Sequence, residues 1–185
     1  MICNTSNDAQ IEKACRMTAK AMINTACFVE IFRGTEESRL SSLSFLFKKN
    51  YLMMQNKCPE AMHYTFADNG DLDCFFMLVP NDVAHFSLCE MINGGLLELP
   101  LYYGYFSMQR LLQVSEFAQA TEKELMAEYP HYLAVQRMVV TPTKQGQGIG
   151  TKCLNKALVE VADKQQLPVI LGTHEARNVT FYSRL

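Results

Sequence analysis

The order of elements in the last third of the chain constrains the fold more than any other feature. Leu133–Val140 has the apolar, β-branched content of a strand, and residues 148–165 place apolar side chains at the spacing of one helix face. Residues 168–171 are typical of a short buried strand. Strand, glycine-rich turn, helix and strand form a βαβ unit, and the crossover rule predicts that its two strands lie parallel.

Five further helices are predicted, the first two from apolar residues at helical spacing and the others from the residues that begin or end them. They cover residues 9–28, 35–54, 86–92, 103–129 and 178–185. Asp8 and Asn178 are the predicted N-caps of the first and last of these helices, because a short polar side chain can accept a hydrogen bond from the first turn. Pro130 is expected to end the helix over residues 103–129, since the residue before a proline avoids helical geometry.

A β-hairpin is predicted between the second and third of these helices. Residues 63–67 and 74–79 have strand composition, and the Asn69-Gly70 pair between them is a strong signal for a hairpin turn. The helices over residues 86–129 therefore separate this hairpin from the βαβ unit.

Composition favours one soluble domain. The chain has 185 residues, 49 % of them apolar, so a core of ordinary size and a single domain over residues 1–185 are expected. A formal net charge of −2 gives no basic field for nucleic acid. Seven cysteines without a C-x-x-C pair indicate reduced thiols, and four scattered histidines predict no metal site. Without a span-length apolar stretch, a cytoplasmic protein with no membrane partner is expected.

Three alternating glycines follow the strand that ends at Val140: Gly146, Gly148 and Gly150. Glycines let a ligand approach the backbone closely, and free N–H groups with the positive end of a helix dipole favour anions. This spacing fits neither the P-loop nor the Rossmann fingerprint. A phosphate-bearing cofactor is therefore the predicted ligand, and a tight connection that binds nothing is the alternative.

The same loop carries a family resemblance. Gln145-Gly146-Gln147-Gly148-Ile149-Gly150 resembles the Q/R-x-x-G-x-G/A signature of the GNAT superfamily of N-acetyltransferases, and residues 177–185 resemble its later motif with an Asn and a Tyr. His131-Tyr132 and the preceding helices resemble the branch that includes puromycin N-acetyltransferase. The resemblance implies an α/β (α+β) fold with a mixed, largely antiparallel sheet, a central βαβ unit and a helical insertion before the fourth strand.

The function implied by the resemblance is transfer of an acetyl group from acetyl-coenzyme A to a primary amine of a small molecule, by direct attack. The implied cofactor contacts are Met138, Val139, Val140, Gln145, Gly146, Gln147, Gly148, Ile149, Gly150, Thr151, Asn178 and Tyr182. By resemblance Tyr182 is also the general acid that protonates the departing thiolate. Packing in the core is the alternative for this tyrosine.

Two departures from the family pattern open other interpretations. The predicted fourth strand lacks the Glu that many members use as base, which leaves His131, His174, Glu90, Glu98 or a water chain. Members also continue past the position of Leu185 with two more strands; either the sequence is a shortened one or the sheet is completed in another way, and an exposed sheet edge predicts low solubility, a partner or a swapped homodimer. The alternatives to an enzyme are a coenzyme A-binding module with impaired catalysis and an interaction protein.

The role of residues 99–106, within the predicted helical insertion, is also ambiguous. Residues 99–106 contain Leu99, Leu101, Tyr102, Tyr103, Tyr105 and Phe106. These side chains could line a pocket for the amine substrate. A plain helix-packing cluster explains them equally well.

Overall fold

The computed structural model describes residues 2–3, 8–95, 98–173 and 176–184. The chain divides into two compact units, each built from separate stretches of sequence. Unit 1 comprises residues 1–10, 58–84 and 131–185, and unit 2 comprises residues 11–57 and 85–130. The predicted insertion between the third and fourth strands therefore belongs to the same unit as the N-terminal helices.

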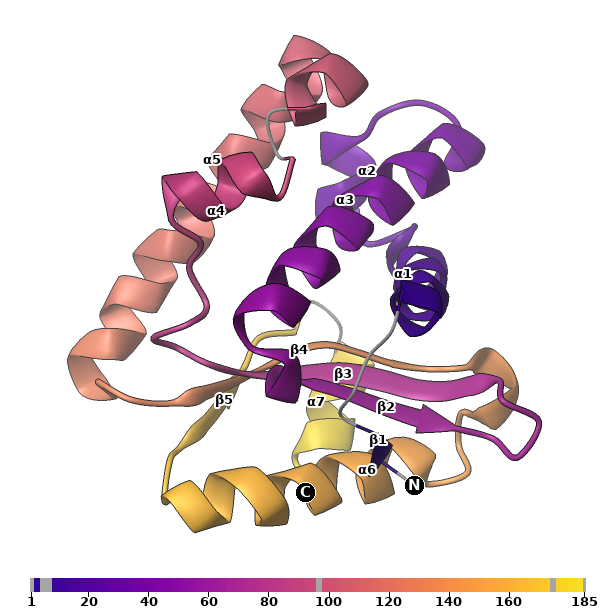
Figure 1. Cartoon of the computed structure of the whole chain (residues 1–185), viewed down its shortest axis with the longest axis vertical. Helices are drawn as coiled ribbons and strands as arrows, with labels where there is room; N and C mark the ends of the chain where they lie inside the picture. The colour runs from indigo at the N-terminus through magenta and orange to yellow at the C-terminus, as the bar shows by residue number, and fades with distance from the viewer. Residues whose placement is uncertain (1, 4–7, 96–97, 174–175, 185) are drawn as a thin grey trace. The chain divides into compact units, whose positions relative to one another are not determined.

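Unit 1 contains a mixed sheet with the strand order β1-β2-β3-β4-β5. The strands are β1 (Ile2–Cys3), β2 (Met62–Phe66), β3 (Leu72–Pro80), β4 (Leu133–Val140) and β5 (Val169–Leu171). Neighbours pair antiparallel except β4 and β5, which pair parallel (Figure 1). The predicted α+β class and the mixed, largely antiparallel sheet are thus confirmed.

The predicted hairpin is β2–β3. Gly70 has a φ of 80°, its N–H donates to the Ala67 carbonyl oxygen (2.9 Å), and the Asp71 N–H donates to the Asn69 side-chain oxygen (3.1 Å). The Asn-Gly pair therefore makes the turn that the sequence predicts. Strand β1 was not predicted, since two residues are too few to show an alternating pattern.

The predicted βαβ unit is present as β4, α6 and β5. Helix α6 (Ile149–Ala157) continues into a π-helical segment, η4 (Leu158–Asp163), and Leu133 pairs with Val169 in the parallel ladder. The unit lies at one edge of the described sheet, because β5 is its last strand, so the predicted central position is wrong.

The core of unit 1 lies between the sheet and α6. Its buried members come from β3, β4, α6 and η4: Cys74, Phe76, Leu78, Leu133, Val135, Cys153, Leu154, Ala157 and Ala162. Alternate residues of β3 point to this side, as the two-residue period of a strand requires. The apolar face of α6 therefore covers one face of the sheet.

Helix α7 (Ala176–Tyr182) begins two residues before Asn178, so the prediction of Asn178 as its N-cap is wrong. The Asn178 side-chain amide instead donates a hydrogen bond to the Thr173 hydroxyl oxygen (3.1 Å), inside the first turn. The helix ends at Tyr182 and residues 183–184 form a turn, so the prediction of a helix continuing to Leu185 is wrong; Leu185 itself lies outside the described residues.

Unit 2 contains α1 (Asp8–Met22) from Ile11 onward, α2 (Ala26–Ile31) and α3 (Glu36–Lys57). Asp8 is itself helical and not a cap before the helix, and the single helix predicted over residues 9–28 is interrupted after Met22. The buried Arg39 side chain explains the interruption, because its guanidinium donates to the carbonyl oxygens of Ile23 (2.8 Å) and Phe32 (3.4 Å). A contact between α3 and the chain around α2 thus overrides local periodicity.

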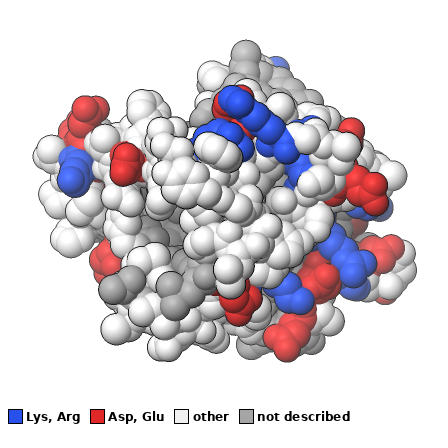
Figure 2. Space-filling view, turned by 90° about the horizontal axis from the view of Figure 1, so that it is seen from above, with Lys and Arg blue, Asp and Glu red and all other residues white. Residues whose placement is uncertain are grey.

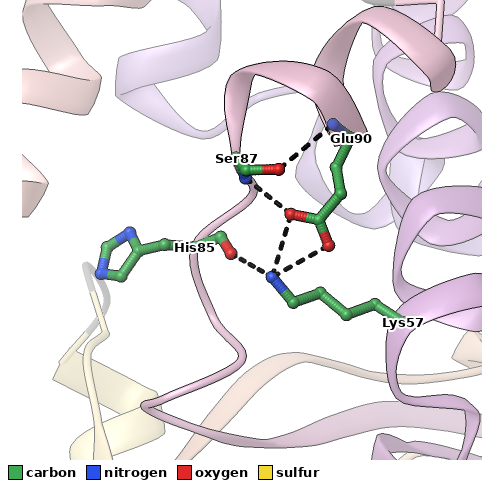
Figure 3. A network of polar contacts seen from close by, with 4 residues as sticks. All are labelled: Lys57, His85, Ser87 and Glu90. Atoms are coloured by element: carbon green, nitrogen blue, oxygen red, sulfur yellow. Dashed lines mark hydrogen bonds and ion pairs between the residues drawn. The ribbon is translucent and has the colours of Figure 1, made fainter.

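The insertion contains α4 (Leu88–Asn93) and α5 (Leu99–Glu128). Ser87 and Glu90 form a capping box, and the Lys57 ammonium contacts the Glu90 carboxylate and the His85 carbonyl oxygen (Figure 3). This network joins the end of α3 to the start of α4. Both helices were predicted, but α5 begins earlier than expected and is kinked at Gly104, whose φ is 73°.

Charges of both signs are interspersed with uncharged residues on the face drawn in Figure 2. Within the described residues, no helix has both the length and the apolar content needed to cross a membrane.

Candidate coenzyme site

The glycine loop joins β4 to α6 through a short 3-10 segment, η3 (Pro142–Lys144). Gly146 and Gly148 both have a φ of 75°, and Gly148 is the residue before α6. Left-handed backbone geometry of this kind costs a side-chain-bearing residue roughly 1–2 kcal/mol, so glycine is favoured at both positions. A Cβ added at either would meet no atom within 4 Å, so the loop backbone faces open space.

Two glutamine side chains hold the loop against the chain before it. The Gln145 amide donates to the Val140 carbonyl oxygen (3.0 Å), and the Gln147 amide donates to the Thr143 carbonyl oxygen (2.9 Å). Their side-chain amides thus stabilise the turn. The main-chain N–H groups are what the loop offers to a ligand.

Gly150 has a different role from the other two glycines. A Cβ here would lie 3.1 Å from the Met138 methyl carbon, 3.2 Å from Val140 Cγ2 and 3.5 Å from Phe181 Cζ. Gly150 therefore lets α6 pack closely on β4 and approach α7. Met138 and Val140 direct side-chain atoms into this contact and are partly buried against the core of unit 1.

The first turn of α6 has the properties of an anion site. The Lys152 N–H is the first that bonds within the helix, to the Gly148 carbonyl oxygen (3.0 Å). The N–H groups of Ile149, Gly150 and Thr151 precede it and have no i−4 helical carbonyl to bond. Together with the helix dipole they can bind a phosphate oxygen.

Strand β4 is irregular where it nears the loop. Phe75 pairs with Val139 and Met77 with Gln136, so β4 has one more residue than β3 in this interval, and Arg137 has a φ of 52°. This β-bulge was not predicted, because its signal is pairing between distant strands.

The β4–β5 ladder ends before β4 does. Its last pair is Val135 with Leu171, whereas β4 continues to Val140. A strand edge beyond the end of a ladder can pair with an extended ligand that carries amides. Residues 136–140 lie beyond the end of the β4–β5 ladder, contain the bulge, and lead to the start of the glycine loop.

Tyr182 and Asn178 lie one turn apart on α7, as predicted. The Tyr182 ring is half-buried against the core of unit 1, and burial, with a smaller effect of the Cys74 thiol, raises its pKa. At neutral pH the hydroxyl therefore keeps its proton. Packing and a proton-donor role are both compatible with this position.

The contact of Cys153 on α6 with Thr65 and Cys74 of the sheet was not predicted. The Cys153 sulfur lies 3.1 Å from the Thr65 hydroxyl oxygen, and a hydrogen bond with the Cys74 thiol lowers the pKa of Cys153 and raises that of Cys74. All cysteines whose side chains are described are free thiols. Sequence spacing could not reveal the pair, since β3 and α6 are distant in the chain.

The predicted base candidates belong to both units: Glu90 and Glu98 are in unit 2, and His131 is in unit 1. The Glu90 carboxylate is bound by Ser87 and Lys57, which lower its pKa to about 2, and Glu98 lies 3.0 Å from the Lys49 ammonium. His131 is exposed just before β4, and His174 lies outside the described residues. In the described chain, no three His, Cys, Asp or Glu side chains are arranged to hold a metal ion.

No model of a protein family matches the chain, and no curated protein matches its sequence.

Proposed function

We propose that this protein is a GNAT-type N-acetyltransferase that transfers the acetyl group of acetyl-coenzyme A to a primary amine of a small molecule. The observation that carries the proposal is the continuity of residues 136–148. This stretch leads from a bulged strand edge to an open glycine turn at the start of a helix. A strand edge suits the pantetheine amides and a helix start suits the pyrophosphate.

The chain's own groups have separable tasks in this reaction. Main-chain groups of residues 136–140 hold the pantetheine arm, and N–H groups from Gly146 to Thr151 hold the pyrophosphate. The neutral amine nitrogen attacks the thioester carbonyl, the carbon–sulfur bond breaks, and Tyr182 gives its proton to the thiolate, while the proton lost by the amine nitrogen passes through water and restores the Tyr182 hydroxyl. N–H groups near the bulge stabilise the charge on the carbonyl oxygen.

Titration of the purified chain with acetyl-coenzyme A tests the proposal. We expect saturable one-to-one binding in calorimetry and, at about 100 times the dissociation constant, roughly 2.7 kcal/mol of added stability. Free adenosine is the control for weak stacking. No binding and no thermal shift would leave the loop as a simple connection and favour an interaction protein.

Tyr182→Phe separates catalysis from binding. It removes the hydroxyl and keeps the ring that packs against the core, so we expect unchanged affinity for acetyl-coenzyme A. With an amine acceptor found by screening, release of free thiol should slow by on the order of 10²-fold. Phe181→Leu on the same helix is the packing control. An undiminished rate in Tyr182→Phe would make this tyrosine a core residue.

A coenzyme-binding module without catalysis is the second candidate. It is favoured by the raised pKa of Tyr182, which makes the phenol a weaker acid, and by a fourth strand without a carboxylate. Tight binding of acetyl-coenzyme A with no thiol release across a broad panel of amines would identify this function.

A further inference from the structure

Cys74 of β3 and Cys153 of α6 face each other in the core of unit 1, where their exposed fractions are 1 % and 6 %. Thr65 of β2 is the cross-strand partner of Cys74, and side chains opposite each other on one face of a sheet have Cβ atoms about 4.5–5.5 Å apart. The Cys153 sulfur lies 3.1 Å from the Thr65 hydroxyl oxygen. The strand register and this contact therefore place the Cys153 sulfur beside Cys74, and a hydrogen bond joins the two thiols.

The packing around the two cysteines keeps their sulfurs in this arrangement. Phe76, two residues after Cys74 on β3, and Leu154 and Ala157 of α6 are buried in the same core. Two cysteines whose side chains point apart cannot be bridged without backbone movement. The thiols of Cys74 and Cys153 already contact each other, so a bond between them needs no unfolding of unit 1.

Cys153 has the properties of the more reactive thiol of the pair. Hydrogen bonds with the Cys74 thiol and the Thr65 hydroxyl, and the charge of the Lys152 ammonium, lower the pKa of Cys153 although burial opposes them. The same hydrogen bond with Cys153, together with burial, raises the pKa of Cys74. The thiolate is the form that attacks an oxidant, so Cys153 reacts first while Cys74 holds its proton.

Cys58 has the opposite properties in the same unit. Its exposed fraction is 4 %, and burial, with the nearby Glu60 carboxylate, raises its pKa to about 11. A buried thiol that keeps its proton in this way is inert towards oxidants. Cys58 is therefore the matched control for Cys153, since both are buried and they differ in the groups that contact their sulfurs.

We propose that Cys74 and Cys153 form a redox-active dithiol, which a hydroperoxide converts into an intramolecular disulfide between β3 and α6. The Cys153 thiolate attacks one peroxide oxygen, the oxygen–oxygen bond breaks, and Cys153 becomes a sulfenic acid. The Cys74 thiol then displaces water from the Cys153 sulfur as the sulfur–sulfur bond forms. With hydrogen peroxide, the two thiols lose two electrons and two protons, and the products are one disulfide and two water molecules. The proposal does not depend on acetyl transfer, because it rests on contacts within unit 1.

The disulfide fixes α6 on the sheet. Cys153 lies one turn after Ile149, the first residue of α6, so the bond anchors the helix that follows the glycine loop. A cross-link between residues that are far apart in the chain restricts the unfolded state. We expect the oxidised chain to melt at a higher temperature than the reduced chain in circular dichroism, and dithiothreitol to reverse the shift. An oxidised chain that melts no higher would contradict this consequence.

Peptide mapping identifies the bond. Trypsin is expected to release residues 58–110 and residues 153–156 as separate peptides. In a Cys58→Ser/Cys89→Ser chain, each of these peptides contains one cysteine, and that cysteine is a member of the proposed pair. One equivalent of hydrogen peroxide, added to this folded chain, should join the two peptides, and dithiothreitol should separate them again.

Trapping of the sulfenic acid tests the order of the steps. In Cys74→Ala the sulfenic acid on Cys153 has no thiol to react with, so dimedone should label Cys153 about 10-fold more than Cys58. Cys153→Ser should form no linked peptide and should leave Cys74 unlabelled. Circular dichroism checks that both variants fold. Peptides that stay separate after oxidation of the folded Cys58→Ser/Cys89→Ser chain, or equal labelling of Cys58 and Cys153, would overturn the proposal.

Discussion

Gly148→Asp should weaken binding of acetyl-coenzyme A by at least about 10²-fold, or roughly 2.7 kcal/mol. Gly148 precedes the first residue of α6, its φ is 75°, and open space surrounds the position of an added Cβ. The new carboxylate would project to where the pyrophosphate is expected and repel it. It could also accept hydrogen bonds from the first turn, which would occupy the N–H groups that the ligand needs. Calorimetric titration measures the loss.

Two variants separate the effects of charge, shape and backbone strain. Gly148→Asn has nearly the same shape as the aspartate without its charge, so its loss of affinity should be smaller. Gly70→Asp imposes a similar backbone cost in the β2–β3 turn, where φ is 80° and space is also open, and it should bind normally. If Gly148→Asp binds acetyl-coenzyme A as well as Gly70→Asp does, the loop is not the phosphate site.

The sequence predicted the elements whose signals are local. The β2–β3 hairpin depends on one Asn-Gly pair, and β4, α6 and β5 depend on apolar runs, the first two separated by glycines and the last preceded by Pro168, so each could be recognised from a short stretch of sequence. The turn glycines of the candidate site were found for the same reason. These glycines have left-handed backbone geometry, which glycine adopts at little energetic cost.

Features that depend on distant contacts were missed. Arg39 interrupts the first predicted helix through bonds to Ile23 and Phe32, and the bulge at Arg137 exists only because β4 pairs with β3. The grouping of the N-terminal helices with the insertion likewise joins residues 11–57 to residues 85–130. No periodicity within a single segment encodes such contacts.

His63 is another residue whose importance the sequence does not show. It lies in β2, is 4 % exposed, and its ring stacks on Phe76 with centroids 4.8 Å apart. Neither ring nitrogen has a hydrogen-bond partner among the described residues. Burial lowers its pKa to about 4, from an ordinary value near 6.5. The folded protein therefore holds this histidine neutral at pH values where the unfolded chain would protonate it.

This difference predicts acid destabilisation within a defined pH range. Above about pH 6.5 His63 is neutral in both states and has no effect on the pH dependence. As the pH falls from 6.5 towards 4, the unfolded chain binds a proton that the folded chain does not, so the free energy of unfolding should fall by up to about 3 kcal/mol. Urea unfolding followed by far-UV circular dichroism measures this, since the chain has no tryptophan for fluorescence.

His63→Phe should remove this part of the pH dependence. The phenyl ring can still stack on Phe76, it cannot be protonated, and it buries no unpaired nitrogen, so the variant should also be more stable at neutral pH by about 1–3 kcal/mol. His131→Phe is the control, because His131 is exposed and its replacement should leave the wild-type slope unchanged. Parallel loss of stability in wild type and His63→Phe between pH 6.5 and 4 would show that other groups cause the acid sensitivity. In that case the His63 imidazole would have to gain hydrogen-bond partners or contact with water when it is protonated in the folded protein.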